Sequence, residues 1–216
     1  MLSPRQRSLK RAMDVAGASA ALVVMGPSMA VIAIVIRRTM GRPVLYRQVR
    51  VGRHGRPFVM PKFRTMNQPH ATRPSITVAR DPAVTPFGRA LRRTRLDELP
   101  QLWCVVRGDM SLVGPRPDVP GYADLLEGRD RRVLELRPGI TGPATIAFRD
   151  EESMLASVTD PQRLNDDVIY PAKTRLNLAY VEQWSLGGDC RYLLATLHPV
   201  FERWLPASDR SHGSPI

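Results

Sequence analysis

The chain has 216 residues, a formal net charge of +12 at pH 7 and only 6% aromatic side chains. Its length suffices for one domain with a packed core and appended helices. The basic excess indicates a polyanionic partner, which can be a nucleic acid, an anionic membrane surface or a phosphorylated substrate. The low aromatic content argues against a single-stranded nucleic-acid platform, because such platforms stack bases on aromatic rings.

The two cysteines, Cys104 and Cys190, lack the spacing of a metal-binding motif, and one of them lies in an apolar run. We interpret both as reduced thiols of a protein that faces the cytosol. A disulfide between them is the less favoured alternative.

The first predicted element is an uncharged apolar run, 15–36, with Lys10 and Arg11 before it and Arg37 and Arg38 after it. About 20 apolar residues cross a bilayer core, so a transmembrane span is one interpretation. A cleaved signal peptide fits poorly, because the run is too long and lacks a small-residue cleavage site. Basic flanks favour the cytoplasmic side, which places both ends of the run on that side.

Gly26 and Pro27 lie at the middle of this run. Proline removes a backbone donor and clashes with the preceding turn, so the helix should break or bend there. Each half of about 11 residues would be roughly 16 Å long and would reach only about mid-bilayer. We therefore predict a re-entrant helix–break–helix over residues 1–38, with a kinked transmembrane span as the alternative.

After residue 41 the pattern changes to short β-like runs, 43–52 and 56–66, which predict a hairpin with its turn around residues 52–55. We interpret most arginines of this region as solvated or as facing lipid headgroups: Arg47, Arg50, Arg53 and Arg56. The polar residues 67–77 predict a loop.

Helical patterns occupy most of the remaining chain, over 86–94, 97–106, 122–136, 151–158, 163–184 and 191–205, and 140–148 has a strand-like pattern. The broad apolar face of 191–205 fits core packing or a position in the membrane interface. We predict a mostly α fold with a small β-hairpin and short strands. Its parts are a membrane-embedded segment (1–38), a cytosolic or interfacial domain with amphipathic helices (39–206) and a disordered tail (207–216).

Asp97 and Glu98 are adjacent carboxylates between an arginine-rich helix and a Gly-Pro-Arg-Pro turn that carries Arg116. Thr94 precedes Asp97 by three residues and acidic residues suit the first turn of a helix, so capping is one interpretation. The other is chemical, because a carboxylate beside arginine stays ionised and available as a nucleophile or metal ligand. Phosphoryl transfer requires such an anion, cations that hold phosphates and, usually, Mg²⁺. The chain has no P-loop, GxGxxG or HExxH motif, so ATP-type and zinc-type mechanisms are unsupported.

The segment LDELPQLWCVVRGDMSLVGPRP, 96–117, resembles the signature of the bacterial sugar transferases, monotopic phosphoglycosyl transferases that act on polyprenyl phosphate. The resemblance covers nearly the whole chain, through KRAMD, GRPVLYRQVRVGRHGRPFVMPKFRTM, RPGITG, FRDEES and YPAKTRLNLAYVEQWSLGGD. It implies the minimal catalytic form of the family, without the additional N-terminal membrane helices of larger relatives. It also favours the re-entrant interpretation of residues 1–38.

The resemblance implies a two-step reaction at the cytoplasmic face of the bacterial inner membrane. Asp97 would attack the β-phosphorus of a UDP-sugar and release UMP, and polyprenyl (undecaprenyl) phosphate would then take the sugar phosphate. Glu98 would assist by positioning, by proton transfer or by metal contact. Mg²⁺ is the implied cofactor, with Asp97 as its protein ligand. Lys62, Arg92 and Arg116 match basic family positions, which we assign to the diphosphate and the acceptor phosphate.

Two positions depart from the family pattern. Gly26 precedes Pro27 where the family often has serine, which leaves the geometry of the bend open. Cys104 follows the tryptophan where the family usually has asparagine, and we interpret it as a packing residue.

Two other functions remain open at this level. A membrane-anchored basic nucleic-acid-binding protein would explain the charge but not the carboxylate pair, and we expect no nucleic-acid partner. An inactive scaffold of a polysaccharide assembly complex is disfavoured by the intact Asp97, Glu98 and Arg116. The sugar, the surface-glycan pathway and the oligomeric state, a homodimer included, are not readable from the sequence. We place sugar selectivity in residues 151–170.

Overall fold

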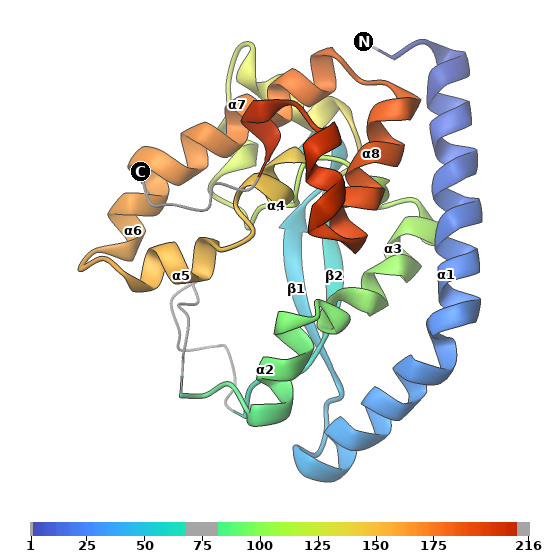
Figure 1. Ribbon diagram of the computed structural model, residues 1–216, viewed down its shortest axis with the longest axis vertical. Coiled ribbons are helices and arrows are strands. Elements are labelled where there is room, and N and C mark those ends of the chain that lie inside the picture. The colour runs from blue at the N-terminus through green and yellow to red at the C-terminus, as the bar shows by residue number, and fades with distance from the viewer. Residues whose placement is uncertain (1, 68–81, 211–216) are drawn as a thin grey trace.

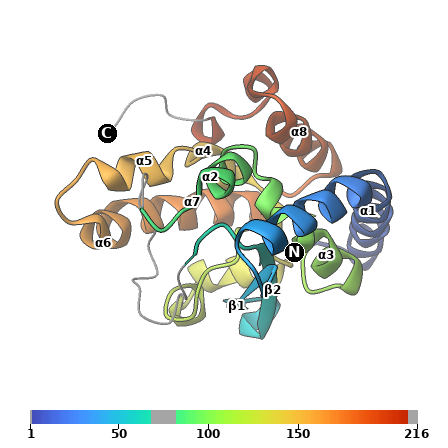
Figure 2. The same ribbon diagram turned by 90° about the horizontal axis from the view of Figure 1, so that it is seen from below.

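The computed structural model describes residues 2–67 and 82–210, and most of this part of the chain is helical (Figure 1). Two small two-stranded sheets complete it. The prediction of a mostly α fold with a small hairpin and short strands is confirmed. A single long helix runs along one side of the molecule, and α5 and α6 lie on the opposite side (Figure 1, Figure 2).

Helix α1 (Pro4–Thr39) contains the apolar run. It starts with a capping box, in which the Ser3 side chain accepts from the Gln6 N–H and the Gln6 side chain accepts from the Ser3 N–H. The helix continues through Pro27, and the predicted break takes the form of a bend in its lower half (Figure 1). By length and composition α1 can cross a membrane, with a mean hydropathy of 2.3 over its most apolar stretch. Only 11% of that stretch is buried in the protein, so most of its apolar surface faces outward.

Buried polar contacts fix the N-terminal half of α1 to the domain. Lys10 Nζ lies 2.6 Å from Asp189 Oδ2, and the Asp14 carboxylate accepts from Ser111 Oγ at 2.9 Å. The Tyr180 hydroxyl donates to the second oxygen of Asp189 at 2.7 Å. We call Lys10, Asp14, Ser111, Tyr180 and Asp189 the anchor cluster. Its partners come from segments more than 90 residues apart, so it links α1 to the C-terminal half of the chain.

The C-terminal half of α1 is held by apolar packing instead. Ile32 and Ile36 are buried against Phe63 and Leu91. The first half of α1 therefore combines buried ionic contacts with apolar packing of Ala18, whereas apolar packing holds the second half.

The predicted hairpin is present. Strand β1 (Leu45–Val51) pairs antiparallel with β2 (Pro57–Phe63), and Leu45 lies opposite Phe63. The short 3₁₀ turn η1 (Arg53–Gly55) joins the two strands, with His54 and Gly55 at positive φ as a tight turn requires. The hairpin packs against η3 (Leu96–Gln101), which follows α2 (Pro86–Arg93).

The predicted helix over 97–106 is two elements, the 3₁₀ helix η3 and the α-helix α3 (Leu102–Arg107). The change from 3.0 to 3.6 residues per turn shifts the faces of this segment. Trp103, in the first turn of α3, is 59% exposed. After α3, β3 (Ser111–Val113) pairs in parallel with β4 (Gly139–Thr141).

The C-terminal half of the described chain is built from short helices. They are η4 (Ala123–Leu125), η5 (Asp130–Glu135), α4 (Pro143–Ala147), α5 (Glu151–Ala156), α6 (Pro161–Leu164), η6 (Asn165–Ile169), α7 (Tyr170–Glu182), α8 (Leu186–Leu197), η7 (Pro199–Trp204) and η8 (Ala207–Asp209). A packed core of Val113, Ile146, Tyr180, Val181 and Tyr192 joins these helices to β3.

Four sequence predictions in this half were too simple. One helix over 122–136 is replaced by two 3₁₀ turns, with Gly128 at positive φ between them. The predicted strand over 140–148 stops at Thr141, because Pro143 begins α4. The helix predicted over 163–184 contains the π-helical turn η6, and the helix over 191–205 changes to 3₁₀ geometry at Pro199.

The predicted tail, 207–216, is ordered at its start. Asp209 is buried and accepts a hydrogen bond of 2.5 Å from the Tyr192 hydroxyl. Residues 211–216 of that tail lie outside the described residues, as do 68–77 of the predicted loop. Both cysteines are free thiols, with Cys104 buried and Cys190 exposed.

Candidate active site

A wide cleft of about 2310 Å³ lies between the hairpin, α2 and η3 on one side and α4, α5 and α7 on the other. Ligand pockets usually measure about 300–1,000 Å³, so this cleft has room for a large ligand or for two ligands. All the sequence-predicted site residues line it: Lys62, Arg92, Asp97, Glu98 and Arg116. We call these residues the cleft cluster. They come from β2, α2, η3 and the turn after β3, so the fold brings distant segments together.

The backbone between α2 and η3 turns the two carboxylates into the cleft. Thr94 ends α2, with its N–H and its hydroxyl donating to the Ala90 carbonyl oxygen. Arg95 has a φ of 55°, in the left-handed region, and η3 starts after it without any side-chain cap. The capping interpretation of Thr94 and Asp97 is therefore wrong, because Thr94 serves the preceding helix. Asp97 and Glu98 are each 8% exposed, in the first turn of η3.

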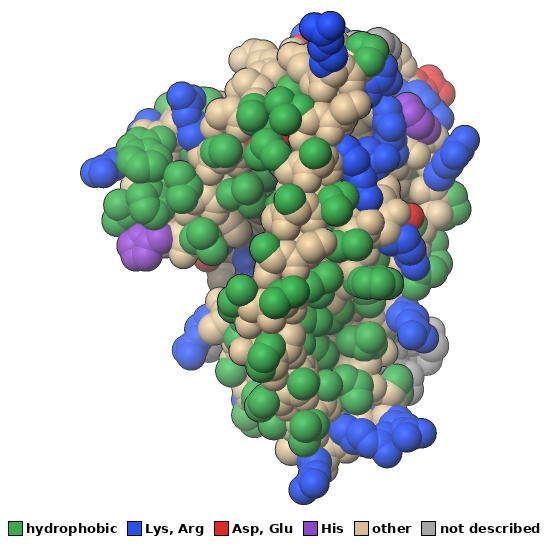
Figure 3. Space-filling view, turned by 90° about the vertical axis from the view of Figure 1, so that its right-hand side faces the viewer, with side chains coloured by type: hydrophobic (Ala, Val, Ile, Leu, Met, Phe, Trp, Pro, Cys, Tyr) green, Lys and Arg blue, Asp and Glu red, His purple; other side chains and the backbone are tan. Residues whose placement is uncertain are grey.

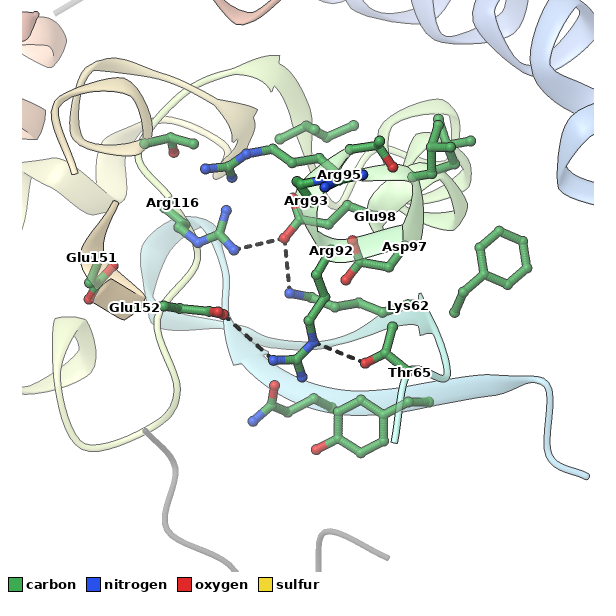
Figure 4. Close-up of a pocket in the computed structure, with 18 of the residues that line it drawn as sticks. Lys62, Thr65, Arg92, Arg93, Arg95, Asp97, Glu98, Arg116, Glu151 and Glu152 are labelled. Carbon is green, nitrogen blue, oxygen red and sulfur yellow. Dashed lines mark hydrogen bonds and ion pairs between the residues drawn. The ribbon is translucent and has the colours of Figure 1, made fainter. Parts of the chain in front are cut away.

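Glu98 is held by two cations. Its Oε1 accepts from Arg116 Nη2 at 2.8 Å and from Lys62 Nζ at 3.0 Å (Figure 4). Burial alone would raise the pKa of Glu98, but Arg116 and Lys62 outweigh it and hold that pKa well below its usual range. Glu98 in turn raises the pKa of Arg116, while burial lowers the pKa of Lys62. Glu98 is therefore a permanent anion at neutral pH.

Asp97 differs from its neighbour. Within residues 2–67 and 82–210, no hydrogen bond or ion pair reaches its carboxylate, and Figure 4 shows it beside Glu98 without a contact line. Burial raises the pKa of Asp97 to about 6, with Lys62 acting against this shift and the charge of Glu98 adding to it. At pH 7 and above the carboxylate is ionised and its lone pairs are free. It has the state that a nucleophile or a metal ligand needs.

Contacts within the protein also restrict the positions of Arg92 and Arg116. Arg92 Nε donates to Thr65 Oγ1 at 3.0 Å, and its Nη1 lies 3.6 Å from Glu152 Oε1 (Figure 4). Arg116 follows the buried Pro115 and precedes the buried Pro117, which restrict the backbone of this turn. Preorganised cations of this kind can bind phosphate groups without a large ordering cost.

Sequence reasoning missed several charged residues of the cleft. Arg50, which we expected to be solvated or at the headgroups, is partly buried and donates to the Pro117 carbonyl oxygen at 3.1 Å. Burial, followed by the nearby Arg116, lowers the pKa of Arg50 to about 10. Burial also raises the pKa of Asp118 to about 6. Arg50 and Gln48 are two residues apart on β1, so their side chains lie on the same face of the strand, and both line the cleft. This alternation along the strand is the sequence signal that could have placed Arg50 in the cleft.

A magnesium ion fits the residues of this cleft. The described residues contain no group of three or more acidic, histidine or cysteine side chains that could hold a metal ion. Mg²⁺, however, is usually held by one or two carboxylates together with substrate phosphates. The Asp97 carboxylate is the unengaged one of the pair, whereas Oε1 of Glu98 already accepts from Lys62 and Arg116.

The chain is similar to a known protein family and to several individual bacterial proteins. Residues 5–203 match the family model described as Bacterial sugar transferase. The sugar transferase EpsL of Bacillus subtilis is 37% identical over 77% of this chain and 74% of its own length. The UDP-glucose:undecaprenyl-phosphate glucose-1-phosphate transferase of Escherichia coli is 35% identical over 93% of this chain but only 42% of its own length. The exopolysaccharide production protein ExoY of Rhizobium meliloti is 33% identical, over 88% of this chain and 84% of its own length.

Proposed function

The chain belongs to the bacterial sugar transferase family, and from this premise we propose that it moves a sugar 1-phosphate from a UDP-sugar to undecaprenyl phosphate. Relatives bear names of phosphotransferases with these substrates, and the chain is an enzyme of this phosphotransferase type. One observation carries the proposal: two equally buried, adjacent carboxylates, of which Glu98 is neutralised by cations and Asp97 is not. The product would start a surface glycan or glycoconjugate.

In the first step an oxygen of the Asp97 carboxylate attacks the β-phosphorus of the UDP-sugar. A bond forms between Asp97 and that phosphorus, the bond to the oxygen that bridges the two phosphates breaks, and UMP leaves with the electron pair. The enzyme then carries the sugar phosphate as a mixed anhydride. Because the pKa of Asp97 is about 6, the attacking group is already ionised at neutral pH and no base is required.

In the second step a phosphate oxygen of the polyprenyl phosphate attacks the same phosphorus. The bond to Asp97 breaks, the carboxylate is regenerated, and a polyprenyl diphosphate sugar forms. Lys62, Arg92 and Arg116 would hold the donor diphosphate and the acceptor phosphate and stabilise charge in the transition state. Bound Mg²⁺, held by Asp97 and the donor phosphates, would supply further neutralisation of the leaving phosphate.

The geometry favours one of the roles open for Glu98. A carboxylate whose pKa lies well below its usual range does not accept a proton at neutral pH. Its contacts with Arg116 and Lys62 instead keep both cations in place beside Asp97. We therefore assign Glu98 as a positioning residue and not as the base.

The exposed apolar surface supports a position at the membrane. Val23, Val24, Val31 and Ile34 are each more than half exposed on α1, and Figure 3 shows hydrophobic side chains along its length with lysines and arginines around the edges. A lipid-linked acceptor requires an active site at headgroup level, and basic surfaces favour anionic lipids. We propose that α1 enters the inner membrane and returns, with the catalytic domain on the cytoplasmic face.

The end of the chain adds to this surface. Leu194 and Leu197 on α8 and Val200 and Trp204 on η7 are exposed apolar side chains. An apolar face of this kind suits an interfacial helix that lies in the headgroup region. Reporters placed before Lys10 and after Arg38 would both be accessible from the cytoplasm if α1 is re-entrant, and from opposite sides if it spans.

The function is tested by release of UMP from a panel of UDP-sugars in the presence of undecaprenyl phosphate and Mg²⁺. We expect release with at least one sugar, and a lipid product that carries the same sugar. Salt-sensitive binding of nucleic acid without UMP release would point to the basic binding protein instead. Absence of both would favour the scaffold.

A further inference from the structure

One wall of the cleft has polar groups that the proposed mechanism does not use. Tyr170, Thr174 and Asn177 follow one face of α7 at helical spacing and line the cleft. Thr145 on α4, which packs against α7, lines the same cleft. We call these residues the α7 wall.

Three polar atoms of the α7 wall lack hydrogen-bond partners, and two of them belong to side chains that are at least nine-tenths buried. Asn177 is 8% exposed and Thr145 is 9% exposed. Within the part of the chain that the structure describes, Oδ1 of Asn177, Oγ1 of Thr145 and the hydroxyl of the less buried Tyr170 have no partner. Buried polar atoms are nearly always paired, because leaving one unpaired costs free energy. Three such atoms in one wall of the active cleft indicate that a bound ligand supplies the partners.

A nearby threonine gives the contrast. Thr196 also lines the cleft, but its hydroxyl lies 2.6 Å from the Thr141 hydroxyl and donates to the Tyr192 carbonyl oxygen at 2.7 Å. Its hydrogen bonds are therefore complete within the protein. The unpaired state is a property of Thr145 and not of cleft threonines in general.

The α7 wall begins beside Arg116. A second, small cavity is lined by Arg116 and Asp118 together with Tyr170, Thr174 and Asn177, which places the guanidinium next to this face of α7. Helix α7 packs on α4, η5 and η6, whereas α1 packs on α3, β3 and η3. The two helices lie on different sides of the domain (Figure 1, Figure 2). A ligand that reaches the α7 wall therefore comes from the aqueous side, as the nucleotide sugar does.

The side chains of the α7 wall suit the sugar of the UDP-sugar better than its phosphates. Asp118 and Glu151 bring carboxylates to the same region, and Glu151 Oε1 is paired with Lys173 at 2.6 Å. Carboxylates repel phosphate groups but accept hydrogen bonds from hydroxyl groups. Amide and hydroxyl side chains provide both donors and acceptors for a polyhydroxylated ring.

We propose that Asn177 and Thr145 hydrogen-bond the hydroxyl groups of the donor sugar and so determine which UDP-sugar the enzyme uses. This inference rests on the proposed function. It extends sugar selection beyond residues 151–170, to two positions on α4 and α7 that flank that segment in the chain.

The test uses the full-length enzyme with Asn177→Leu and Thr145→Val, which keep side-chain size and remove the polar atoms. We expect at least a tenfold loss in kcat/KM for the UDP-sugar that the wild type prefers, mainly through KM, and a smaller preference over its epimers. Inhibition by UMP, which lacks the sugar, should be unchanged. The melting temperature should stay equal or rise, because the deleted atoms are unpaired in the free protein. The matched control, Thr196→Val, breaks existing bonds and should lower the melting temperature with unchanged sugar kinetics.

Any other outcome contradicts the inference, and each one points to a different explanation. Parallel weakening of UMP inhibition would assign the wall to the nucleotide. A lower melting temperature with unaltered sugar kinetics would make the two residues structural. If the wild type releases UMP and the variants match it, the inference alone is wrong. If the wild type releases UMP from no UDP-sugar, the proposed function is wrong and the inference falls with it.

Discussion

The anchor cluster and the cleft cluster are both buried sets of charges, yet they differ in how completely those charges are paired. In the anchor cluster the Asp189 carboxylate accepts from Lys10, Tyr180 and Trp184, and Lys10 also donates to the Val113 carbonyl oxygen. In the cleft cluster one oxygen of Glu98 accepts from Lys62 and Arg116, but the equally buried Asp97 has no such partner among the described residues. Complete pairing serves to hold α1 on the domain, whereas an unpaired carboxylate is what the proposed nucleophile requires.

The two neighbouring carboxylates of the cleft cluster also differ from each other in the direction of their pKa shifts. Asp97 and Glu98 have the same exposure, but the pKa of one is raised and the pKa of the other is lowered. Burial alone cannot produce opposite shifts. The positions of Lys62 and Arg116, which contact Glu98 and not Asp97, decide which carboxylate is neutralised.

The largest expected effect is on catalysis at Asp97. The substitution Asp97→Asn removes the proposed nucleophile and should lower the rate of UMP release by on the order of 10⁴-fold or more. With labelled donor and no lipid, wild type should retain base-sensitive label and the variant none. As a control, Asp109→Asn changes an aspartate outside the cleft and should leave the rate unchanged. Activity above about a tenth of wild type in the Asp97 variant would rule out the covalent route.

Breaking the anchor cluster should change stability and not chemistry. In Asp189→Asn the buried Lys10 loses its counter-ion, which should cost about 3–5 kcal/mol in the free energy of unfolding, measured in detergent. The kcat of the protein that remains folded should stay within about threefold of wild type, since the cluster contacts no cleft residue of the mechanism. Asp167→Asn, in the exposed pair with Arg163, serves as the control and should cost less than about 0.5 kcal/mol. Loss of kcat without loss of stability would contradict a purely structural role.

Glu98 is ion-paired like Asp189 of the anchor cluster, but it lies in the cleft beside Asp97. Glu98→Gln releases Lys62 and Arg116 and should lower kcat by about 100-fold. It also removes the negative charge that helps to raise the pKa of Asp97, so the acidic limb of the pH–rate profile should move to lower pH. Glu98→Asp should restore part of the rate. An unshifted profile would show that Glu98 does not act through this electrostatic coupling.

The unpaired state of Asp97 should have a cost in stability. Its folded pKa of about 6 lies above the ordinary value of 3.8, so folding stability decreases as pH rises from about 4 to about 6. Removing the charge reverses this loss, and Asp97→Asn should be more stable than wild type by about 2 kcal/mol at pH 7.5. At pH 4 the difference should vanish. Equal melting temperatures at both pH values would mean that the ionised carboxylate is better solvated than its burial indicates.

The smallest effect is the pH dependence of the wild-type enzyme. Because only ionised Asp97 attacks in the proposed mechanism, kcat/KM for formation of the labelled enzyme should be flat above pH 7 and fall about tenfold per unit below pH 6. Single-turnover labelling in mixed buffers measures this directly. A limb centred near pH 4 would place Asp97 in a paired environment, like that of Glu98.

Much of the site was readable from the sequence because its motif is local. Asp97, Glu98 and Arg116 lie within 20 residues of each other, and Lys62 and Arg92 lie in a recognisable hairpin and a helix. The periodicity of 43–66 and 86–94 also predicted the hairpin and α2 correctly. Predictions failed where one residue redirects the chain, as Pro143 does after β4, or where helix type changes, as at Leu102.

The sequence by itself determined the family, the identity of the cleft cluster and the apolar length of α1, because residue types, their order and their hydropathy are local properties. Tertiary structure alone decided which of two adjacent carboxylates is paired, how Arg50 and Asp118 enter the cleft, and that Asn177 and Thr145 remain unpaired there. These properties depend on distances between side chains from distant segments. Asp97 and Glu98 are both acidic and consecutive, and only the folded positions of Lys62 and Arg116 pair one of them with cations and leave the other unpaired, as its proposed role requires.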